Sequence, residues 1–542
     1  MSSPRYYRPA PAVSDAAAPL TTDLCIYGAN AAGVMAAVQA RRLGLSVALL
    51  NPAVQLGGLT TGGLGYTDVG NKAAIGGLAL EFYRRLGAHY GKEVEWCFEP
   101  RVAERTLGAF LTEVGVVAHH GHYVASVVRD AAPAAAPRIR ELVTTSGLRV
   151  RAAYFLDCSY EGDLLAHAGV SFTVGREGNA AHGETFNGQQ VHATHQFTRP
   201  VDPYVVPGVA ASGLLPGIDP DSSFIPGQGD RRVQAYNFRV CMTRRRDLRV
   251  PFARPSGYDR GRYELLARYF ASGGGEDPFT KFDRIQGDKT DTNNHGAFST
   301  DMIGESWDWA GADYATRERL FQAHVAYQQG YHWFMANDPA VPEKTRLAYA
   351  EWGLASDEFV ATGHWPHQLY IREARRMIAD LIMTEHHCFG RQTAEEVIAL
   401  GAYGMDSHNC RRFVQAGAVL NEGDVQIKLP RPYGIGYRAI LPRRSECANL
   451  LVPVCLGASH IAYGSIRMEP VFMGLAQSAA TAAALALRSG QVAAQDVSYD
   501  ELRRQLLRDG QILDWEPTRL NEGDGNVVFE ASARPARACG LA

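Results

Sequence analysis

Apolar and polar positions near the amino terminus predict a strand, a tight turn, a helix and a second strand. DLCIYG (23–28) is apolar toward its end, ANAAGVMAAVQARRLG (29–44) carries a long apolar stretch of helix formers, and SVALLN (46–51) is apolar again. A strand, a helix and a strand in this order form the βαβ unit of a parallel sheet. We therefore predict an α/β protein.

Further along the chain the pattern is less regular. It predicts helices at 79–91 and 102–114, strands at 116–119 and 123–128, and a turn at 131–137. The stretch LRVRAAYFLDCS (148–159) ends in a continuous apolar run, typical of a strand buried on both faces. From 174 to 428 aromatic, His, Asn and Asp residues increase on irregular segments, with helices expected at 315–337 and 372–384.

The first pattern returns late in the chain, with a strand at 448–457 and a long helix at 469–490. We therefore predict a Rossmann-like domain with a discontinuous chain, 21–173 and 429–490, and an inserted mixed α+β substrate domain at 174–428. Residues 1–20, rich in Pro and Ala, are expected to be a flexible arm. Residues 491–542 form a C-terminal tail, with an amphipathic helix entered through Asp496 or Ser498.

Composition and charge narrow the possible partners. A formal net charge of -3 over 542 residues offers no general attraction to nucleic acid, and Arg244 to Arg246 are interpreted as a solvated face. Nine cysteines without a Cys-x-x-Cys pair argue against zinc, iron–sulfur and disulfide frameworks. We see neither a signal peptide nor a membrane span. The expectation is a cytoplasmic protein without a membrane or nucleic-acid partner.

A glycine turn follows the first predicted strand. Gly28 can reverse the chain and Gly33 lets the helix approach the sheet, while Asn30 stands where a second glycine is usual. Asn is acceptable there because it tolerates positive φ better than most residues. Backbone N–H groups and the helix dipole could receive a pyrophosphate here, although a turn that only closes a βα unit would look the same.

A second glycine loop, GGLTTGGLG (57–65), follows the second strand. A surface turn does not need this density of glycine, whereas bare backbone approaching a flat ligand does. An enzyme that binds only NAD has no use for such a loop, but a flavoprotein must hold ribityl and isoalloxazine groups beyond the pyrophosphate. The two loops together favour FAD over NAD.

Motifs along most of the chain resemble one flavoprotein family. They are YGANAAGVMAA, LGGLTTGGLGYTD, IGGLALEFYRRLGAHYG, FLDCSYEGDLLAHAGV, KTDTNNHGAFSTDMIG, GHWPHQLYIREARRM, YGMDSHN and ASHIAYGSIRMEPVFMGLAQSAA. The chain resembles the FAD-dependent oxidoreductases among the glutathione-reductase-like Rossmann flavoproteins. The resemblance implies that FAD binds to the discontinuous domain.

The resemblance also implies a role for each motif. The first turn would receive the pyrophosphate, Asn51 the ribose in place of the usual acid, the second glycine loop the inner part of FAD, and the backbone of Val124 the adenine. Residues 157–163 would run near the cofactor, and 465–468 would direct a helix N-terminus at the flavin N1/O2 edge. The residues expected to hold FAD are Gly28, Asn30, Ala32, Gly33, Asn51, Gly57, Gly58, Leu59, Thr60, Gly63, Val124, Ser159, Gly162, Asp163, Ser465, Arg467 and Met468.

We expect FAD to be bound non-covalently. Related flavoproteins such as succinate dehydrogenase attach FAD through a His in this glycine loop, where the present chain has Leu59, Thr60 and Thr61. A link through Cys158 stays open in principle, beside the alternative that this cysteine is a buried structural residue.

Five residues are candidates for the chemistry. The loop TDTNNHG (290–296) offers His295, although Asx turns could account for its polar residues. GHWPHQLYIRE (363–373) offers His364 and His367 as bases and Arg372 as a clamp for an anion or carbonyl. His460, before the last long helix, could reach the flavin or only buttress it. The spacing of His364 and His367 would suit a metal, but no third ligand stands out and no metal is expected.

These features predict an FAD-dependent dehydrogenase or oxidase that transfers a hydride from a small polar substrate to flavin N5, with a sugar or polyol CH–OH favoured. Only one dinucleotide turn is present, so the electron acceptor is left open among oxygen, a quinone and a protein. The alternatives are a flavoprotein lyase or isomerase without net redox, and a non-catalytic cofactor-binding module. Assembly into a homo-oligomer through the N-terminal arm is also open.

Overall fold

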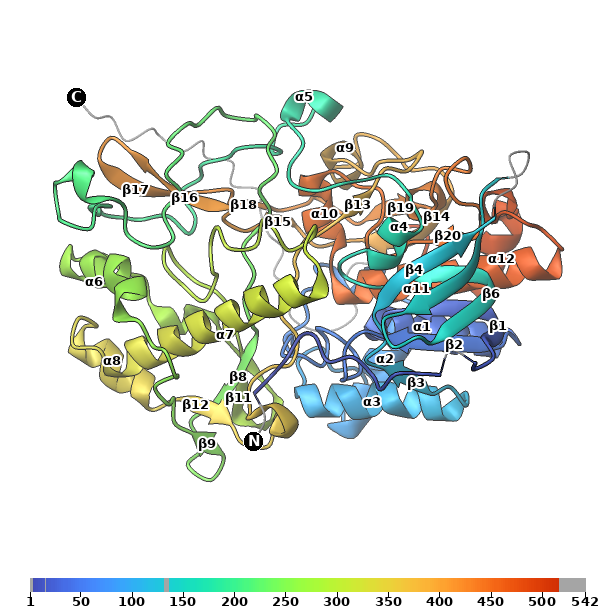
Figure 1. Ribbon diagram of the computed structural model, residues 1–542, viewed down its shortest axis with the longest axis horizontal. Helices are drawn as coiled ribbons and strands as arrows, with labels where there is room; N and C mark the ends of the chain where they lie inside the picture. Colours follow the sequence, from blue (N-terminus) through green and yellow to red (C-terminus); the bar gives the residue numbers. More distant parts are fainter. Residues whose placement is uncertain (1–2, 15, 131–135, 516–542) are drawn as a thin grey trace.

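The computed structural model describes residues 3–14, 16–130 and 136–515. Most of the turn expected at 131–137 and the end of the C-terminal tail lie outside these residues. Figure 1 shows the described chain as two neighbouring halves. One half is built from both ends of the sequence, and the other from its middle.

A mixed sheet organises the first half. Strands β1 and β2 pair in parallel, as the βαβ pattern predicts, and β6 joins the other side of β1, also in parallel. The short strand β20 comes from late in the chain and pairs in parallel with the end of β6. The order is β3-β2-β1-β6-β5-β4, with bounds β1 (Leu20–Tyr27), β2 (Val47–Asn51), β3 (Ala118–His120), β4 (Val124–Arg129), β5 (Ile139–Thr144), β6 (Arg149–Asp157) and β20 (Leu450–Leu451).

Helices from both ends of the chain cover this sheet (Figure 1). The two that pack together most extensively are α1 and α11, both rich in alanine and buried along almost their whole length, and Gln39 of α1 donates to Thr481 of α11 at 2.9 Å. The helices of this half are α1 (Ala31–Arg42), α2 (Gly77–His89), α3 (Pro100–Glu113), α4 (Asp163–His167), α10 (His460–Ile466), α11 (Glu469–Arg488) and α12 (Tyr499–Arg508).

Helix α11 is long and apolar enough to cross a membrane by length and composition, with a mean hydropathy of 1.4, and within the described residues no other helix is. The expectation that no segment of the sequence is long and apolar enough to span a membrane was therefore wrong. Because 89% of the apolar window is buried inside the protein, against α1, α2 and α12, packing accounts for its composition.

The second half combines a five-stranded sheet with long loops. Its longest helix, α7, begins where the Asp313 side chain accepts a hydrogen bond from the Thr316 N–H at 2.7 Å. The helices and sheet strands from the middle of the chain are α5 (Asn179–His182), α6 (Glu264–Ala271), α7 (Tyr314–Asn337), α8 (Glu343–Ala350), α9 (Glu385–Cys388), β8 (Val240–Thr243), β9 (Arg249–Val250), β10 (Phe282–Ile285), β11 (Lys289–Thr292) and β12 (Gly353–Ala355). The two-stranded pairs are β7 (Phe172–Thr173) and β13 (Arg376–Met377), β14 (Val397–Gly401) and β19 (Tyr433–Gly436), β15 (Met405–Ser407) and β18 (Val425–Ile427), β16 (Arg411–Gln415) and β17 (Ala418–Glu422). Of these elements, α9 and β14 lie beside the first half, where α9 packs on α10 and β14 on α11 and α12 (Figure 1).

The expected helix at 372–384 is wrong. The chain there is extended, and Arg376 and Met377 form the short strand β13. Arg372, Arg375 and Arg376 pair with acids from three different segments: Asp301, Asp163 and Glu177, respectively. An extended backbone can direct three neighbouring side chains to such separate partners, and these long-range ion pairs override the local helix propensity.

The N-terminal segment, expected to be a flexible arm, lies along the body. Ala10 donates a backbone hydrogen bond to the Gly121 carbonyl at 2.8 Å, and Val13 donates one to the Ser146 carbonyl at 2.7 Å. These contacts hold the segment against the residues after β3 and the turn between β5 and β6. The domain boundaries themselves stay predictions.

Candidate functional site

The first glycine turn reverses the chain between β1 and α1. Gly28 has φ 102°, and a Cβ there would lie 2.8 Å from the Cys158 carbonyl carbon and the Ser159 nitrogen. The Asn30 side chain accepts from the Gly33 N–H at 3.0 Å and donates to the Cys158 carbonyl. Asn30 has φ -68°, so its tolerance of positive φ, which made it acceptable in the sequence, is not needed. Asn30 instead caps α1 and ties it to the end of β6.

The second glycine loop is held by protein on several sides. A Cβ on Gly63, which has φ 120°, would lie 1.8 Å from the Arg239 carbonyl oxygen, and one on Gly62 would lie 2.5 Å from Gln368 Cβ. Gly62 and Gly63 therefore let the loop pack closely against the second half of the protein. A Cβ on Gly58 would meet the Tyr160 hydroxyl at 2.5 Å, so this glycine keeps the loop close to the cavity described next.

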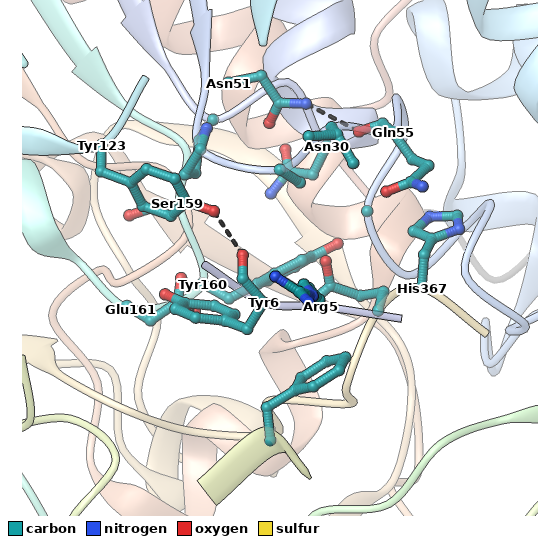
Figure 2. A pocket seen from close by; sticks show the side chains of 17 residues that line it. Arg5, Tyr6, Asn30, Asn51, Gln55, Tyr123, Ser159, Tyr160, Glu161 and His367 are labelled. Carbon is teal, nitrogen blue, oxygen red and sulfur yellow. Dashed lines mark hydrogen bonds between the residues drawn. The ribbon is translucent and has the colours of Figure 1, made fainter. Parts of the chain in front are cut away.

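A cavity runs between the two glycine loops (Figure 2). Its wall combines the carboxyl ends of β1, β2 and β6, the loop after β2, the N-terminal segment, α7 and the segment before Arg372. The residues that line it are Arg5, Tyr6, Gly28, Asn30, Asn51, Pro52, Ala53, Val54, Gln55, Gly58, Tyr123, Ser159, Tyr160, Glu161, Phe321, His367 and Gln368.

Asn51 ends β2 at one side of this cavity. Its side chain accepts from the Ala29 N–H at 3.3 Å and donates to the Gln55 carbonyl at 2.8 Å. Asn51 therefore fixes the loop after β2 against the first turn. Tyr123 lines the cavity close by, whereas the N–H of Val124 donates to the Tyr27 hydroxyl at 3.4 Å and its carbonyl accepts from Tyr314.

Comparison with known families decides which protein family this is. The family of FAD dependent oxidoreductases matches the chain from residue 23 to residue 506. The chain belongs to this family. No curated protein matches the chain.

Several solved structures resemble part of this FAD-dependent oxidoreductase. THI4 of Thermovibrio ammonificans is 20% identical with a TM-score of 0.23, over 29% of this chain and 66% of that one. A flavin monooxygenase mutant of Stenotrophomonas maltophilia is 14% identical with a TM-score of 0.18, over 26% and 38%. Cyclohexanone monooxygenase of Rhodococcus sp. Phi1 bound to NADP+ is 17% identical with a TM-score of 0.19, over 26% and 26%. The chain thus spans less than two thirds of the length of these proteins.

The lining of the cavity fits an extended dinucleotide. Gln55 and Ser159 offer polar groups for hydroxyls, and the N-terminus of α1 offers backbone N–H groups for a pyrophosphate. Gly28 leaves room for the phosphates because it has no side chain, while its own N–H donates to the Leu50 carbonyl. Tyr6, Tyr123 and Phe321 supply aromatic surface. This chemistry suits FAD in an FAD-dependent oxidoreductase.

The structure brings together only some of the residues predicted to hold FAD. Within the described chain the cavity lining contains Gly28, Asn30, Asn51, Gly58 and Ser159. Ser465 and Arg467 face elsewhere in the protein: Ser465 donates to the Tyr403 carbonyl at 2.6 Å, and Arg467 to the Tyr370 hydroxyl at 2.8 Å. The residues from the prediction that stand outside the lining are Ala32, Gly33, Gly57, Leu59, Thr60, Gly63, Val124, Gly162, Asp163, Ser465, Arg467 and Met468.

Asp163 has a different environment from the one expected. It pairs with Arg317 at 2.7 Å and with Arg375 at 2.8 Å. Burial opposes its ionisation, but the two arginines outweigh burial and lower its pKa to about 2. Asp163 is therefore an ionised junction between β6, α7 and the segment before β13.

The five catalytic candidates lie in different parts of the protein. His367 lines the cavity, with Nε2 at 3.5 Å from Thr61 Oγ1, and burial lowers its pKa to about 4. His364, with φ 67°, places Nδ1 at 3.2 Å from the Glu358 carbonyl oxygen. His295 contacts the ring of His195. The cavity lining includes neither of these two histidines.

Arg372 and His460 are buried and bonded to other groups of the protein. Arg372 pairs with Asp301 at 3.1 Å and donates to the side chain of Asn237. His460 Nδ1 lies 2.7 Å from Glu373 and Nε2 lies 3.0 Å from Ser407 Oγ, and burial lowers its pKa to about 3. Neither residue lines the cavity.

A cluster of three carboxylates lies apart from the cavity. Glu99, Asp357 and Glu358 are close enough to one another to bind a metal ion. The ammonium group of Lys289 lies 2.7 Å from an oxygen of each. Arg101 also pairs with all three, so two cations offset most of the negative charge of the cluster.

Sequence reasoning missed Glu469, the first residue of α11. Its carboxyl accepts from Thr60 Oγ1 at 2.7 Å and from the Tyr160 hydroxyl at 2.8 Å, and that hydroxyl accepts from the Leu59 N–H at 3.0 Å. Burial raises its pKa to about 7, and the two hydroxyl donors offset part of the increase. Glu469 therefore connects the N-terminus of α11 to the glycine loop.

We expect Glu469→Gln to increase stability at pH 8 but not at pH 4. The pKa of Glu469 is about 7 in the folded protein, against an ordinary value of 4.5 in the unfolded chain. At a pH between these two values the Glu469 carboxyl keeps a proton in the folded protein that it releases in the unfolded chain. Stability therefore falls as pH rises through this range, by about 3 kcal/mol in all, and stays reduced above it. Glutamine cannot ionise and lacks this loss.

Urea unfolding of both proteins at pH 4 and pH 8 measures the difference. Glu501→Gln, at an exposed position on α12, is the control and should show no comparable gain at pH 8. Parallel pH profiles for wild type and Glu469→Gln would show that Glu469 ionises normally in the folded protein.

Proposed function

We propose that this FAD-dependent oxidoreductase oxidises a small polar substrate, a sugar or polyol CH–OH being favoured, and that FAD binds non-covalently in the cavity. The observation that supports this proposal is that His367 lies in the same cavity as Gly28 and Asn51. His367, a possible base from the second half of the protein, thus lines the same cavity as the glycine turn expected to bind the dinucleotide. When bound, FAD supplies a two-electron acceptor for the substrate hydride.

His367 is suited to take the proton of the oxidised hydroxyl. Its pKa of about 4 leaves the imidazole neutral at pH 7, and Nε2 lies toward Thr61 of the glycine loop. Oxidation of a CH–OH group to a carbonyl releases one hydride and one proton. Bound FAD would supply the acceptor for the hydride, and His367 Nε2 would take the proton. Gln368, which lines the cavity beside His367, can orient the substrate.

The local chemistry supports non-covalent binding. Thr60 donates to Glu469, and Thr61 donates to the Leu56 carbonyl. Cys158 is fully buried outside the cavity lining, and burial raises the pKa of its thiol well above the ordinary value. A thiol held in this state is a poor nucleophile.

Anaerobic titration of the yellow protein tests this function. A panel of sugars, polyols, amines and hydroxy acids is added while the flavin absorbance is followed, and a true substrate should bleach the band persistently. Product formed without bleaching would instead indicate a lyase or isomerase. Admission of oxygen, a quinone or a candidate protein acceptor then shows which one restores the colour, and a colourless protein that refuses FAD would refute the proposal.

A further inference from the structure

The N-terminal strap, residues 3–14, connects the two halves of the protein across the cavity. On the side of the sheet its backbone bonds to Gly121 and Ser146. On the side of α7, the Tyr7 N–H donates to Glu318 at 2.6 Å and the Pro4 carbonyl accepts from Gln322 at 2.8 Å. The strap is therefore held at several points along its length.

Tyr6 anchors the strap at the edge of the cavity. Its hydroxyl donates to Glu161 Oε1 at 3.3 Å and accepts from Arg317 Nη1 at 3.2 Å. Its ring meets Trp309 edge to face, with centroids 4.9 Å apart. The next residue, Tyr7, stacks on Tyr314 of α7 at 5.5 Å. These contacts hold the backbone of the neighbouring Arg5, whose side chain is exposed.

Arg5 is the one Lys or Arg residue among the described residues that line the cavity. Figure 2 draws its side chain in the middle of the pocket, below Asn30 in this view. The first turn of α1 contributes Ala31, Ala32 and Gly33, none of which carries charge. A pyrophosphate entering here would therefore meet backbone N–H groups and a single side-chain cation, in a lining that also contains the carboxyl group of Glu161.

We propose that Arg5, positioned by the strap, binds the pyrophosphate of FAD. The inference rests on the proposed binding of FAD in this cavity. Guanidinium groups match phosphate oxygens with paired hydrogen bonds, and such a cation adds to the favourable field that the N-terminus of α1 already provides for a pyrophosphate. The strap thus completes the cofactor site from outside the predicted Rossmann segments.

The rate at which FAD dissociates from diluted holoenzyme tests this inference without any substrate. Flavin fluorescence increases as the cofactor leaves, and Arg5→Gln should release FAD about five- to tenfold faster than wild type. The rate for wild type should rise more steeply with NaCl than the rate for the variant, because salt screens the charge that the variant lacks. Arg5→Lys should fall between the two.

Arg8→Gln is the matched control, because Arg8 is exposed on the same strap and does not line the cavity. It should release FAD at the wild-type rate. Unchanged or slower release from Arg5→Gln would overturn the inference, and so would faster release with an unaltered salt dependence. Failure of every substrate to bleach the flavin would remove the proposed oxidation and leave this result standing.

Discussion

A His367→Gln variant is expected to reduce its flavin with substrate at least about 100-fold more slowly than the wild type. The loss follows from removal of the neutral imidazole that shares the cavity with the dinucleotide turn, because glutamine cannot accept the substrate proton at this position. FAD content should be unchanged, since His367 contacts the glycine loop only through the 3.5 Å approach to Thr61. Anaerobic stopped-flow absorbance measures the rate.

The pH dependence gives a second check on the same residue. With a pKa of about 4, His367 is unprotonated at neutral pH, so the wild-type reduction rate should be flat above about pH 5 and fall as pH approaches 4. His89→Gln, at the exposed end of α2, is a control with the wild-type rate. If His295→Gln rather than His367→Gln loses flavin reduction, the base lies outside this cavity.

Gly33→Ala is expected to cost about 3 kcal/mol or more of stability and to leave the protein without FAD. A Cβ on Gly33 would lie 1.8 Å from the Gly28 carbonyl oxygen and 3.0 Å from the Gly28 carbonyl carbon. The obstacle is backbone, so it cannot rotate away as a side chain can, and the whole turn between β1 and α1 must open. The unfolding midpoint and the ratio of flavin to protein absorbance report the two losses.

Gly108→Ala is a matched control because Gly108 also lies within a helix, α3, and a Cβ there meets nothing within 4 Å. Alanine should raise stability at that position by about 0.5–1 kcal/mol, since it has the higher helix propensity. A Gly33→Ala protein that unfolds with the wild-type midpoint and keeps its FAD would show that the helix and the turn can separate at little cost.

The sequence by itself determined the parts of the molecule that depend on neighbours along the chain. The β1–α1–β2 unit and the helix α7 follow from local hydrophobic patterns, and α7 spans 314–337 where 315–337 was expected. Gly28 was assigned to the turn from its place between a predicted strand and a predicted helix, and the structure gives it a φ of 102° with no room for a Cβ. The family motifs then predicted the cofactor, FAD.

Only the tertiary structure decided which side chains share the cavity. Among the histidines of the predicted loops, it placed His367 in the wall and left His295 and His364 outside, and it added Arg5, Tyr6 and Gln368. It also turned 372–384 from a predicted helix into an extended segment whose arginines pair with distant acids. The reason is physical: turns and helices form hydrogen bonds within a few residues, whereas a cavity wall and buried ion pairs depend on segments hundreds of residues apart.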